Sequence, residues 1–564
     1  STAQVRALTS AQLNGMDMDH VAALTSTQLQ ALTTTQVQSL TTTMLNNLTT
    51  DQVPVLNSTS VAAINTTALS ALGGDQLNAL SSTQVQALSS TQVQALTTAQ
   101  LANANSTQLE SLSSAQVRVL TSAQLNGLGV DNLQALGTAD LQALTTGQVS
   151  ALSTDQVNNL STGAAGQLAA LTTVQAQSLT SSQLNGLTPE SLGSLTTGAV
   201  RALTTAQVEK LAVAQLDLLS SDQVQALSTG QVRALTTAQV GGMAAAQVTN
   251  LSSAQVQALT TAQLNALGLD AVQGMGTADV QALTTTQVSS MGTADVNELS
   301  SDQVQALSTA QVRALTSAQL NGMDIDHVQA LTSTQLQALT TAQVQSLSSG
   351  TLNLLTTDQV QAITTAQTQA LTSTQLNGLV DVTLTAMETA DVQSLTSTQI
   401  QGLNSTQLST LGTGQVQALS SAQVRAMTTA QISSVASTLL EALTSAQVQS
   451  LTSAQLNVLT APALQAIETA DVQAIGTSQI SNLSSAQLNS LTTDQVQSLT
   501  SVQLQALTTT QMLTLSSSQV EAMTSAQVKV LSSTQLNALN STALRAIETS
   551  DLQEMTTAQL SALS

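Results

Sequence analysis

Apolar residues recur along this chain in a repeat of eight residues, which reads Leu-(Thr/Ser)-(Thr/Ser)-Ala-Gln-(Val/Leu)-Gln-Ala in its commonest form. When each octad is counted so that it ends on the leucine, octads tile residues 1–160, an eleven-residue unit follows at 161–171, and octads continue from residue 172 to 563. The closing residue is Leu, Met or Ile in 68 of the 70 units, with Ala104 and Val435 as exceptions. Self-similarity at a short, fixed period predicts a solenoid.

The polar positions of the octad predict a short helix in every repeat. With the closing leucine numbered 8, position 1 is usually Ser or Thr and position 4 is usually Gln, which together form the capping box of a helix N-terminus. The leucine before the cap and the Val or Leu at position 5 supply a hydrophobic staple. Pro189 and Pro462 lie in the first helical turn, where proline is tolerated. Pro54, at position 6, predicts a local distortion instead.

Other secondary structures fit the octad poorly. In one continuous helix, eight residues advance about 80° beyond two turns and would spread the leucines around the axis. In a strand, positions 5 and 8 would face opposite sides. We therefore predict an all-α repeat solenoid of very short capped helices, one octad per helix, with positions 5 and 8 in a shared core. A β-solenoid is the alternative.

A longer rhythm predicts how the helices stack. Among the octads that carry Leu-Asn at positions 5 and 6, those that begin at residues 180, 260, 316, 372, 452 and 532 are seven or ten octads apart. If seven octads make two superhelical turns and ten make three, one turn holds about 3.3–3.5 octads. The unit at 161–171 adds three residues, close to one helical turn, so we expect a longer helix there. Residues 1–564 are predicted to form a single continuous solenoid domain.

Composition excludes several classes of function. The chain has no aromatic residue and no cysteine, and 7% of its residues are charged, which is unlike an ordinary globular enzyme. The net charge of −22 argues against nucleic acid as a partner, because neutralising phosphates supplies much of that affinity. No apolar stretch is long enough to span a membrane. The chain starts inside the repeat pattern, so we expect a processed product or an excerpt of a longer array.

The two histidines stand in candidate metal sites of the form Asp-x-Asp-His. Carboxylate oxygens and imidazole nitrogens are ligands for divalent ions. Both histidines, however, occupy position 4, where Gln normally closes the cap, so capping is the favoured interpretation. The weak metal candidates here are Asp17, Asp19, His20, Asp324, Asp326 and His327.

Octads with an acid at positions 1 and 4 are a second candidate, for calcium. They recur every ten octads and would form a ladder if every tenth octad returned to one face. We favour the alternative that Asp replaces Gln as the cap partner and interacts with the helix dipole. We therefore assign no cofactor, and calcium is the one ion to test. The candidates are Glu388, Asp391, Glu468, Asp471, Glu548 and Asp551.

Runs such as Leu259–Leu267 and Leu339–Leu347 resemble the repeat arrays of very large proteobacterial proteins of the haem-utilisation or adhesion type. The resemblance covers the whole chain and implies a secreted or surface-attached bacterial protein. We therefore predict a structural protein without enzymatic activity, a rigid rod that self-associates into a filament, sheath or adhesive stalk. The alternative is an adhesin module that binds a surface polysaccharide or another regular lattice, ice included, through ordered Thr and Ser ranks.

Overall fold

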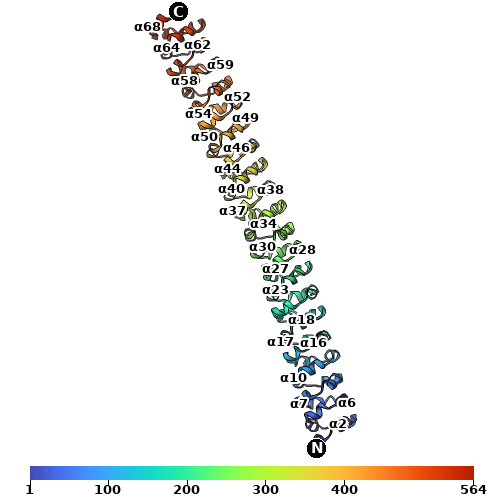
Figure 1. The fold of residues 1–564 in the computed structure, drawn as a ribbon. Coiled ribbons are helices and arrows are strands. Elements are labelled where there is room, and N and C mark those ends of the chain that lie inside the picture. The colour runs from blue at the N-terminus through green and yellow to red at the C-terminus, as the bar shows by residue number, and fades with distance from the viewer. Residues whose placement is uncertain (564) are drawn as a thin grey trace. The chain divides into compact units, whose positions relative to one another are not determined.

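The computed structural model describes residues 1–563, which form 68 α-helices and one 3-10 helix and no strand (Figure 1). The prediction of an all-α repeat solenoid is confirmed, and the β-solenoid alternative is wrong for the described part of the chain. Contacts group the chain into two compact units, Ser1–Leu283 and Thr284–Ser564. The same octad builds both units; that they form one continuous domain stays a prediction.

Every α-helix begins at position 2 of its octad and ends at position 5, 6 or 7. Full-length examples are α10 (Ser82–Ala87) and α11 (Ser90–Ala95). Five helices are only four residues long: α14 (Ser114–Val117), α31 (Thr261–Leu264), α42 (Ser349–Leu352), α57 (Thr469–Val472) and α66 (Ser541–Leu544).

A capping box begins many of the helices, and an extended leucine ends the preceding one. At α12 (Thr98–Ala102), the Gln100 N–H donates to the Thr97 hydroxyl at 3.1 Å, and the Thr97 N–H donates to Gln100 Oε1 at 2.8 Å. Thr97 is extended, with φ −73° and ψ 157°. The leucine that closes an octad is extended as well, as at Leu96 with φ −58° and ψ 135°. Two successive extended residues end one helix and turn the chain into the next.

Positions 5 and 8 of the octads form the core, as the sequence predicts. Val93 at position 5 is fully buried and Leu96 at position 8 is 6% exposed, and this pattern repeats through both units. Helices of six residues or fewer are unstable alone in water. Packing of these two apolar side chains per octad against the neighbouring turns therefore stabilises them.

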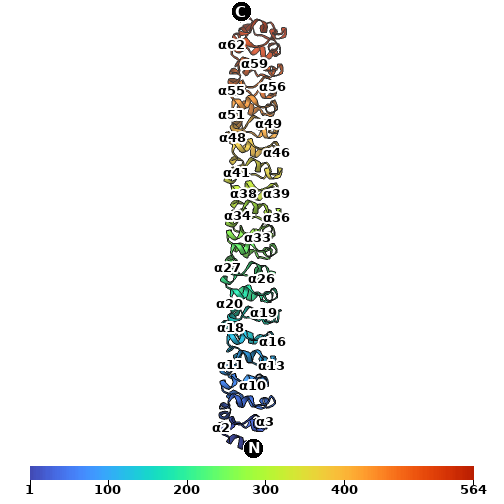
Figure 2. The ribbon, with the colours of Figure 1, turned by 90° about the vertical axis from the view of Figure 1, so that its right-hand side faces the viewer.

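Within each compact unit, a helix lies against the helix about three octads later, and inside each unit Figure 2 shows successive turns following one another in the order of the sequence. In unit 1, α24 (Thr205–Glu209) packs on α27 (Thr229–Ala234), which packs on α30 (Ser253–Ala258). Side-chain hydrogen bonds join octads four apart, as described below. Contacts at both three and four octads agree with the predicted turn of 3.3–3.5 octads.

Two of the repeats depart from the α-helical pattern. As expected from Pro54, its octad forms the 3-10 helix η1 (Val53–Val55) in place of an α-helix. The longer helix predicted at residues 161–171 is wrong, because this unit contains no α-helix. The extra residues loop out between a cap pair that persists: the Ser161 N–H donates to Gln167 Oε1 at 3.0 Å. Gly163 takes a φ of 91°, which glycine adopts without the steric cost of a side chain.

No helix among residues 1–563 is both long and apolar enough to cross a lipid bilayer.

Candidate functional site

The glutamine at position 4 is the most connected polar side chain of the repeat. In α27, Gln231 Oε1 accepts hydrogen bonds from the backbone N–H and the hydroxyl of Ser228, at 2.7 and 2.9 Å. Its Nε2 donates to the carbonyl oxygens of Val200 and Leu203, four octads earlier, at 3.0 and 2.8 Å. The side chain is 2% exposed. One buried amide thus caps its own helix and fastens that helix to the neighbouring turn.

This double role explains why position 4 carries glutamine. A capping box accepts Glu or Gln equally well, but no octad of this chain has Glu at position 4. An amide has both an acceptor and donors, whereas an ionised carboxylate only accepts. Sequence reasoning assigned the cap and missed the link between turns, although the absence of Glu was the signal that a donor is required.

Asparagine at position 6 makes a second link between turns. Asn126 Nδ2 donates to the Ala151 carbonyl at 2.8 Å, and its Oδ1 accepts from the Ser153 N–H at 2.7 Å. Cations at this position reach the neighbouring turn as well: Arg313 Nε donates to the Ala338 carbonyl at 2.9 Å. The side chain at position 6 therefore bonds to both sides of the bend that joins the third and the fourth octad after its own.

The asparagine and the glutamine compete for the same backbone donor. Because Asn126 takes the Ser153 N–H, Gln156 Oε1 is buried without a hydrogen-bond partner in the described structure. The same loss occurs at three other glutamines whose cap N–H is taken from four octads away: Gln215, Gln247 and Gln407. Elsewhere the glutamine has been replaced while the N–H is still accepted from four octads away, at Met44, Ser191, Thr351, Thr383 and Leu439.

Glycine accepts several of these asparagine bonds because the turns approach closely there. Asn353 Nδ2 donates to the Gly378 carbonyl at 2.9 Å, and Asn377 Nδ2 donates to the Gly402 carbonyl at 2.7 Å. A Cβ on Gly378 would lie 2.6 Å from Ser349 Cβ, and one on Gly402 would lie 2.7 Å from the Cβ of Ser373. At the present spacing of these turns the distances leave no room for a Cβ, although Ala151 and Ser346 accept the same bond where the turns lie differently.

The Asp-x-Asp-His candidates form caps. His327 is 8% exposed; its Nδ1 meets Asp324 Oδ1 at 2.5 Å and its Nε2 meets the Leu299 carbonyl at 2.7 Å, so the ring repeats the double role of glutamine. The hydrogen bond to the His327 side chain lowers the pKa of the Asp324 carboxyl. In the other copy, the His20 backbone N–H is the main cause that lowers the pKa of Asp17.

The copy at residues 17–20 is open to solvent. The His20 side chain, which meets Asp17 Oδ1 at 2.5 Å, is 73% exposed. Asp19 and Asp326 occupy the first turns of α3 (Met18–Ala22) and α39 (Ile325–Ala330). Among residues 1–563 no three His, Asp or Glu side chains converge to hold a metal ion. Metal binding at either copy stays a prediction.

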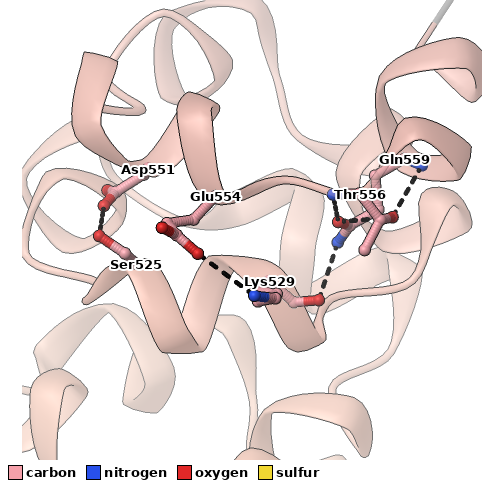
Figure 3. A network of polar contacts seen from close by, with 6 residues as sticks. All are labelled: Ser525, Lys529, Asp551, Glu554, Thr556 and Gln559. Atoms are coloured by element: carbon pink, nitrogen blue, oxygen red, sulfur yellow. Dashed lines mark hydrogen bonds and ion pairs between the residues drawn. The ribbon is translucent and has the colours of Figure 1, made fainter.

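The paired acids occupy buried caps as well. Asp471 and Asp551 are 6% and 2% exposed and accept hydrogen bonds from Ser445 and Ser525, three octads earlier, at 2.5 and 2.6 Å. Figure 3 shows Asp551 beside Ser525 and, beyond the ion pair of Lys529 with Glu554, Gln559, which joins Thr556 to the carbonyl of Lys529. The acid bonds to a hydroxyl where the glutamine bonds to carbonyls.

The buried carboxyl group of Asp391 lies beside a small cavity in the core. Burial is the main cause that raises the pKa of its carboxyl, and the charge of Glu388 adds to it. Asp391, Thr368 and Thr383 line a cavity of about 20 Å³, enough for one water molecule. The other position-1 acids, Glu468 and Glu548, precede α57 (Thr469–Val472) and α67 (Thr549–Glu554) as cap residues without a side-chain cap bond. Calcium binding at these octads stays a prediction.

Comparison with protein families finds the ALTTAQ repeat in nine segments of the chain. They are residues 1–26, 75–103, 105–138, 130–162, 224–253, 272–309, 304–333, 384–421 and 464–501. No curated protein matches the chain. The repeat array predicted from the sequence is therefore confirmed.

Solved structures of APUM23 are among the matches to the fold. The structure with GGAAUUGACGG has 12% identity and a TM-score of 0.13, and covers 88% of this chain and 91% of that one. The structure with GGAUUUGACGG has 12% identity and a TM-score of 0.14, over 88% and 90% of the two chains. These structures join APUM23 to the sequences GGAAUUGACGG and GGAUUUGACGG, and the expectation that nucleic acid is excluded as a partner is corrected and not retained. TM-scores this low carry no argument about what this chain binds.

Proposed function

We propose that this array of ALTTAQ repeats is a structural protein, a rod that assembles into a filament, sheath or adhesive stalk at a bacterial surface. The observation that carries the proposal is the use of the position-4 amides. The acceptor of Gln231 caps its own helix and its donor holds the neighbouring turn, and Gln335 and Gln511 do the same in the other unit. Side chains committed in this way maintain a scaffold, and we assign the chain no catalytic activity.

The exposed surface supports assembly of many copies. Positions 2, 3 and 6 face solvent and carry mostly Ser, Thr, Ala and Gln, so the surface repeats with the octad and is largely uncharged. A regular surface offers the same contact at each turn, and many weak identical contacts add up when two arrays lie side by side. Location outside the cell belongs to the same proposal.

Light scattering and electron microscopy of the full chain test assembly. We expect particles that grow with protein concentration and appear as filaments or bundles. Thr205→Lys with Thr229→Lys places charge on two exposed threonines of helices that pack together, and should weaken assembly while leaving the circular dichroism spectrum unchanged. Monodisperse monomers across physiological salt and calcium would contradict the proposal.

A specific observation favours a second candidate, binding to a regular lattice or glycan. The hydroxyl at position 1 turns inward to the cap, but the hydroxyl at position 2 remains outside, as at Thr205 and Thr229 on neighbouring turns. Exposed hydroxyls on successive turns provide a regular set of donors and acceptors. Thr205→Val with Thr229→Val should reduce thermal hysteresis or glycan binding in proportion to the number of sites changed. No response of the native chain in either assay would dismiss this candidate.

A further inference from the structure

Five Asn–Gly dipeptides all fall at positions 6 and 7 of their octads. They are Asn14-Gly15, Asn126-Gly127, Asn185-Gly186, Asn321-Gly322 and Asn377-Gly378. Asparagine followed by glycine is the dipeptide most prone to deamidation, because glycine has no Cβ to hinder attack by its own backbone nitrogen on the side-chain amide. The proposed structural function does not use this chemistry.

Hydrogen bonds hold both reacting groups of each Asn–Gly dipeptide, the asparagine side-chain amide and the glycine backbone nitrogen. Asn377 Nδ2 donates to the Gly402 carbonyl at 2.7 Å and its Oδ1 accepts from the Asn404 N–H at 2.9 Å, so both ends of the side-chain amide are held by the neighbouring turn. The nucleophile is held too, because the Gly378 N–H donates to the Thr374 carbonyl at 3.0 Å. The other four asparagines make the same two bonds to the neighbouring turn, at 2.6–2.9 Å.

We propose that these five asparagines are latent deamidation sites that the neighbouring turn keeps closed and that react where the turn separates. The Gly378 nitrogen then bonds to Cγ of Asn377. The Cγ–Nδ2 bond breaks, and ammonia leaves with the proton from the glycine amide. Water opens the resulting succinimide ring to aspartate or isoaspartate. No reagent other than water is needed.

Asp217 shows what the product does, because it occupies position 6 in the same way. Its Oδ1 accepts from the Ala244 N–H at 3.4 Å, and this is its one side-chain bond to the next turn in the described structure. A carboxylate has no donor for the carbonyl that the asparagine amide would meet. Deamidation therefore replaces two short bonds with one long one. Opening becomes self-reinforcing, since a modified turn docks more weakly.

Gly402→Ala isolates one of the five sites. The new Cβ would lie 2.7 Å from Ser373 Cβ and push the two turns apart at Asn377, without changing Asn377 or Gly378. The matched control is Gly402→Ala with Ser373→Gly, which removes the side chain that the new methyl group meets. Peptide mapping by mass spectrometry of the full chain, incubated at neutral pH, measures the rate at each asparagine.

In the native chain we expect all five sites to deamidate at least about tenfold more slowly than in chain unfolded by urea, as for groups that react only after local opening. Gly402→Ala should raise the rate at Asn377 alone, leave Asn321 unchanged, and lose its effect in the double variant. Equal rates in folded and unfolded native chain would overturn the proposal, whether or not the variants fold. An unchanged rate at Asn377 in folded Gly402→Ala would overturn it as well.

Discussion

Gln231→Glu preserves the shape of the side chain at position 4 and removes its donor. A carboxylate still accepts the Ser228 N–H, so the cap of α27 should persist. Its second oxygen, however, would face the carbonyl oxygens of Val200 and Leu203, which now receive hydrogen bonds at 3.0 and 2.8 Å. The substitution therefore separates the link between turns from the cap.

The cost follows from these contacts. Two hydrogen bonds contribute about 1 kcal/mol each, and burying a carboxylate against carbonyl oxygens adds to the loss. We expect Gln231→Glu to destabilise the local structure by about 2–4 kcal/mol at pH 7. Gln225→Glu, on an exposed side chain of α26 (Ser221–Ala226), changes the net charge equally and should stay within about 0.5 kcal/mol.

Hydrogen exchange is the suitable assay, because a solenoid opens locally between neighbouring turns. Protection of backbone amides in residues 196–235 reports the free energy of that opening. Lower pH should reverse the effect, because the introduced carboxyl group regains an O–H donor when it is protonated. The folded state of the variant then binds the proton more tightly, and its stability rises as pH falls toward the unfolded pKa of about 4.3. Equal protection in Gln231→Glu and Gln225→Glu at pH 7 would refute the assigned link.

Three further predictions test other contacts. Asn321→Ala leaves the Ser348 N–H without its asparagine acceptor, whereas Asn377→Ala frees the Asn404 N–H for the unpaired Oε1 of Gln407. The first substitution should therefore lower local stability by about 1 kcal/mol more than the second, as measured by hydrogen exchange. Pro54→Gln restores a helical octad and should raise stability by about 1–3 kcal/mol in thermal unfolding followed by circular dichroism. Because burial raises the pKa of Asp391, the folded state binds its proton more tightly than the unfolded chain, whose pKa is the ordinary 3.8. Local stability around Asp391 should therefore fall as pH rises through its raised pKa, and Asp391→Asn should remove this dependence, as exchange at pH 4 and 7 would show.

The helices and their core could be predicted because their determinants lie within eight residues. A cap such as Thr97 with Gln100 is local, and the apolar residues at positions 5 and 8 leave one arrangement that buries both. The partners of the glutamine Nε2 lie 28 and 31 residues away, and no local rule identifies them. These partners depend on the number of octads per turn. The spacing of the Leu-Asn octads limits that number but does not identify the atoms in contact.

The longer helix expected at residues 161–171 does not form, because the types of the extra residues oppose it. Three extra residues suit one more helical turn, but Gly163 adopts a left-handed conformation. Ser161 and Gln167 still form the cap bond across the enlarged loop, and Gln167 Nε2 still reaches the Leu133 carbonyl at 2.9 Å. The contacts that hold the turn thus survive the insertion.

The match between Asn353 and Gly378 affects how the coding sequence can change its number of copies. Block copying has occurred, since residues 9–40 and 316–347 differ at only three of 32 positions. An octad gained or lost between ordinary repeats gives each helix a new partner with the same amides and carbonyls, so selection has little to act on. An octad gained between Asn353 and Gly378 sets a side chain against Ser349, and the two turns must then move apart there. Such pairs therefore make a change of copy number costly among the octads they span, whereas the rest of the array can lengthen and shorten with little loss of stability.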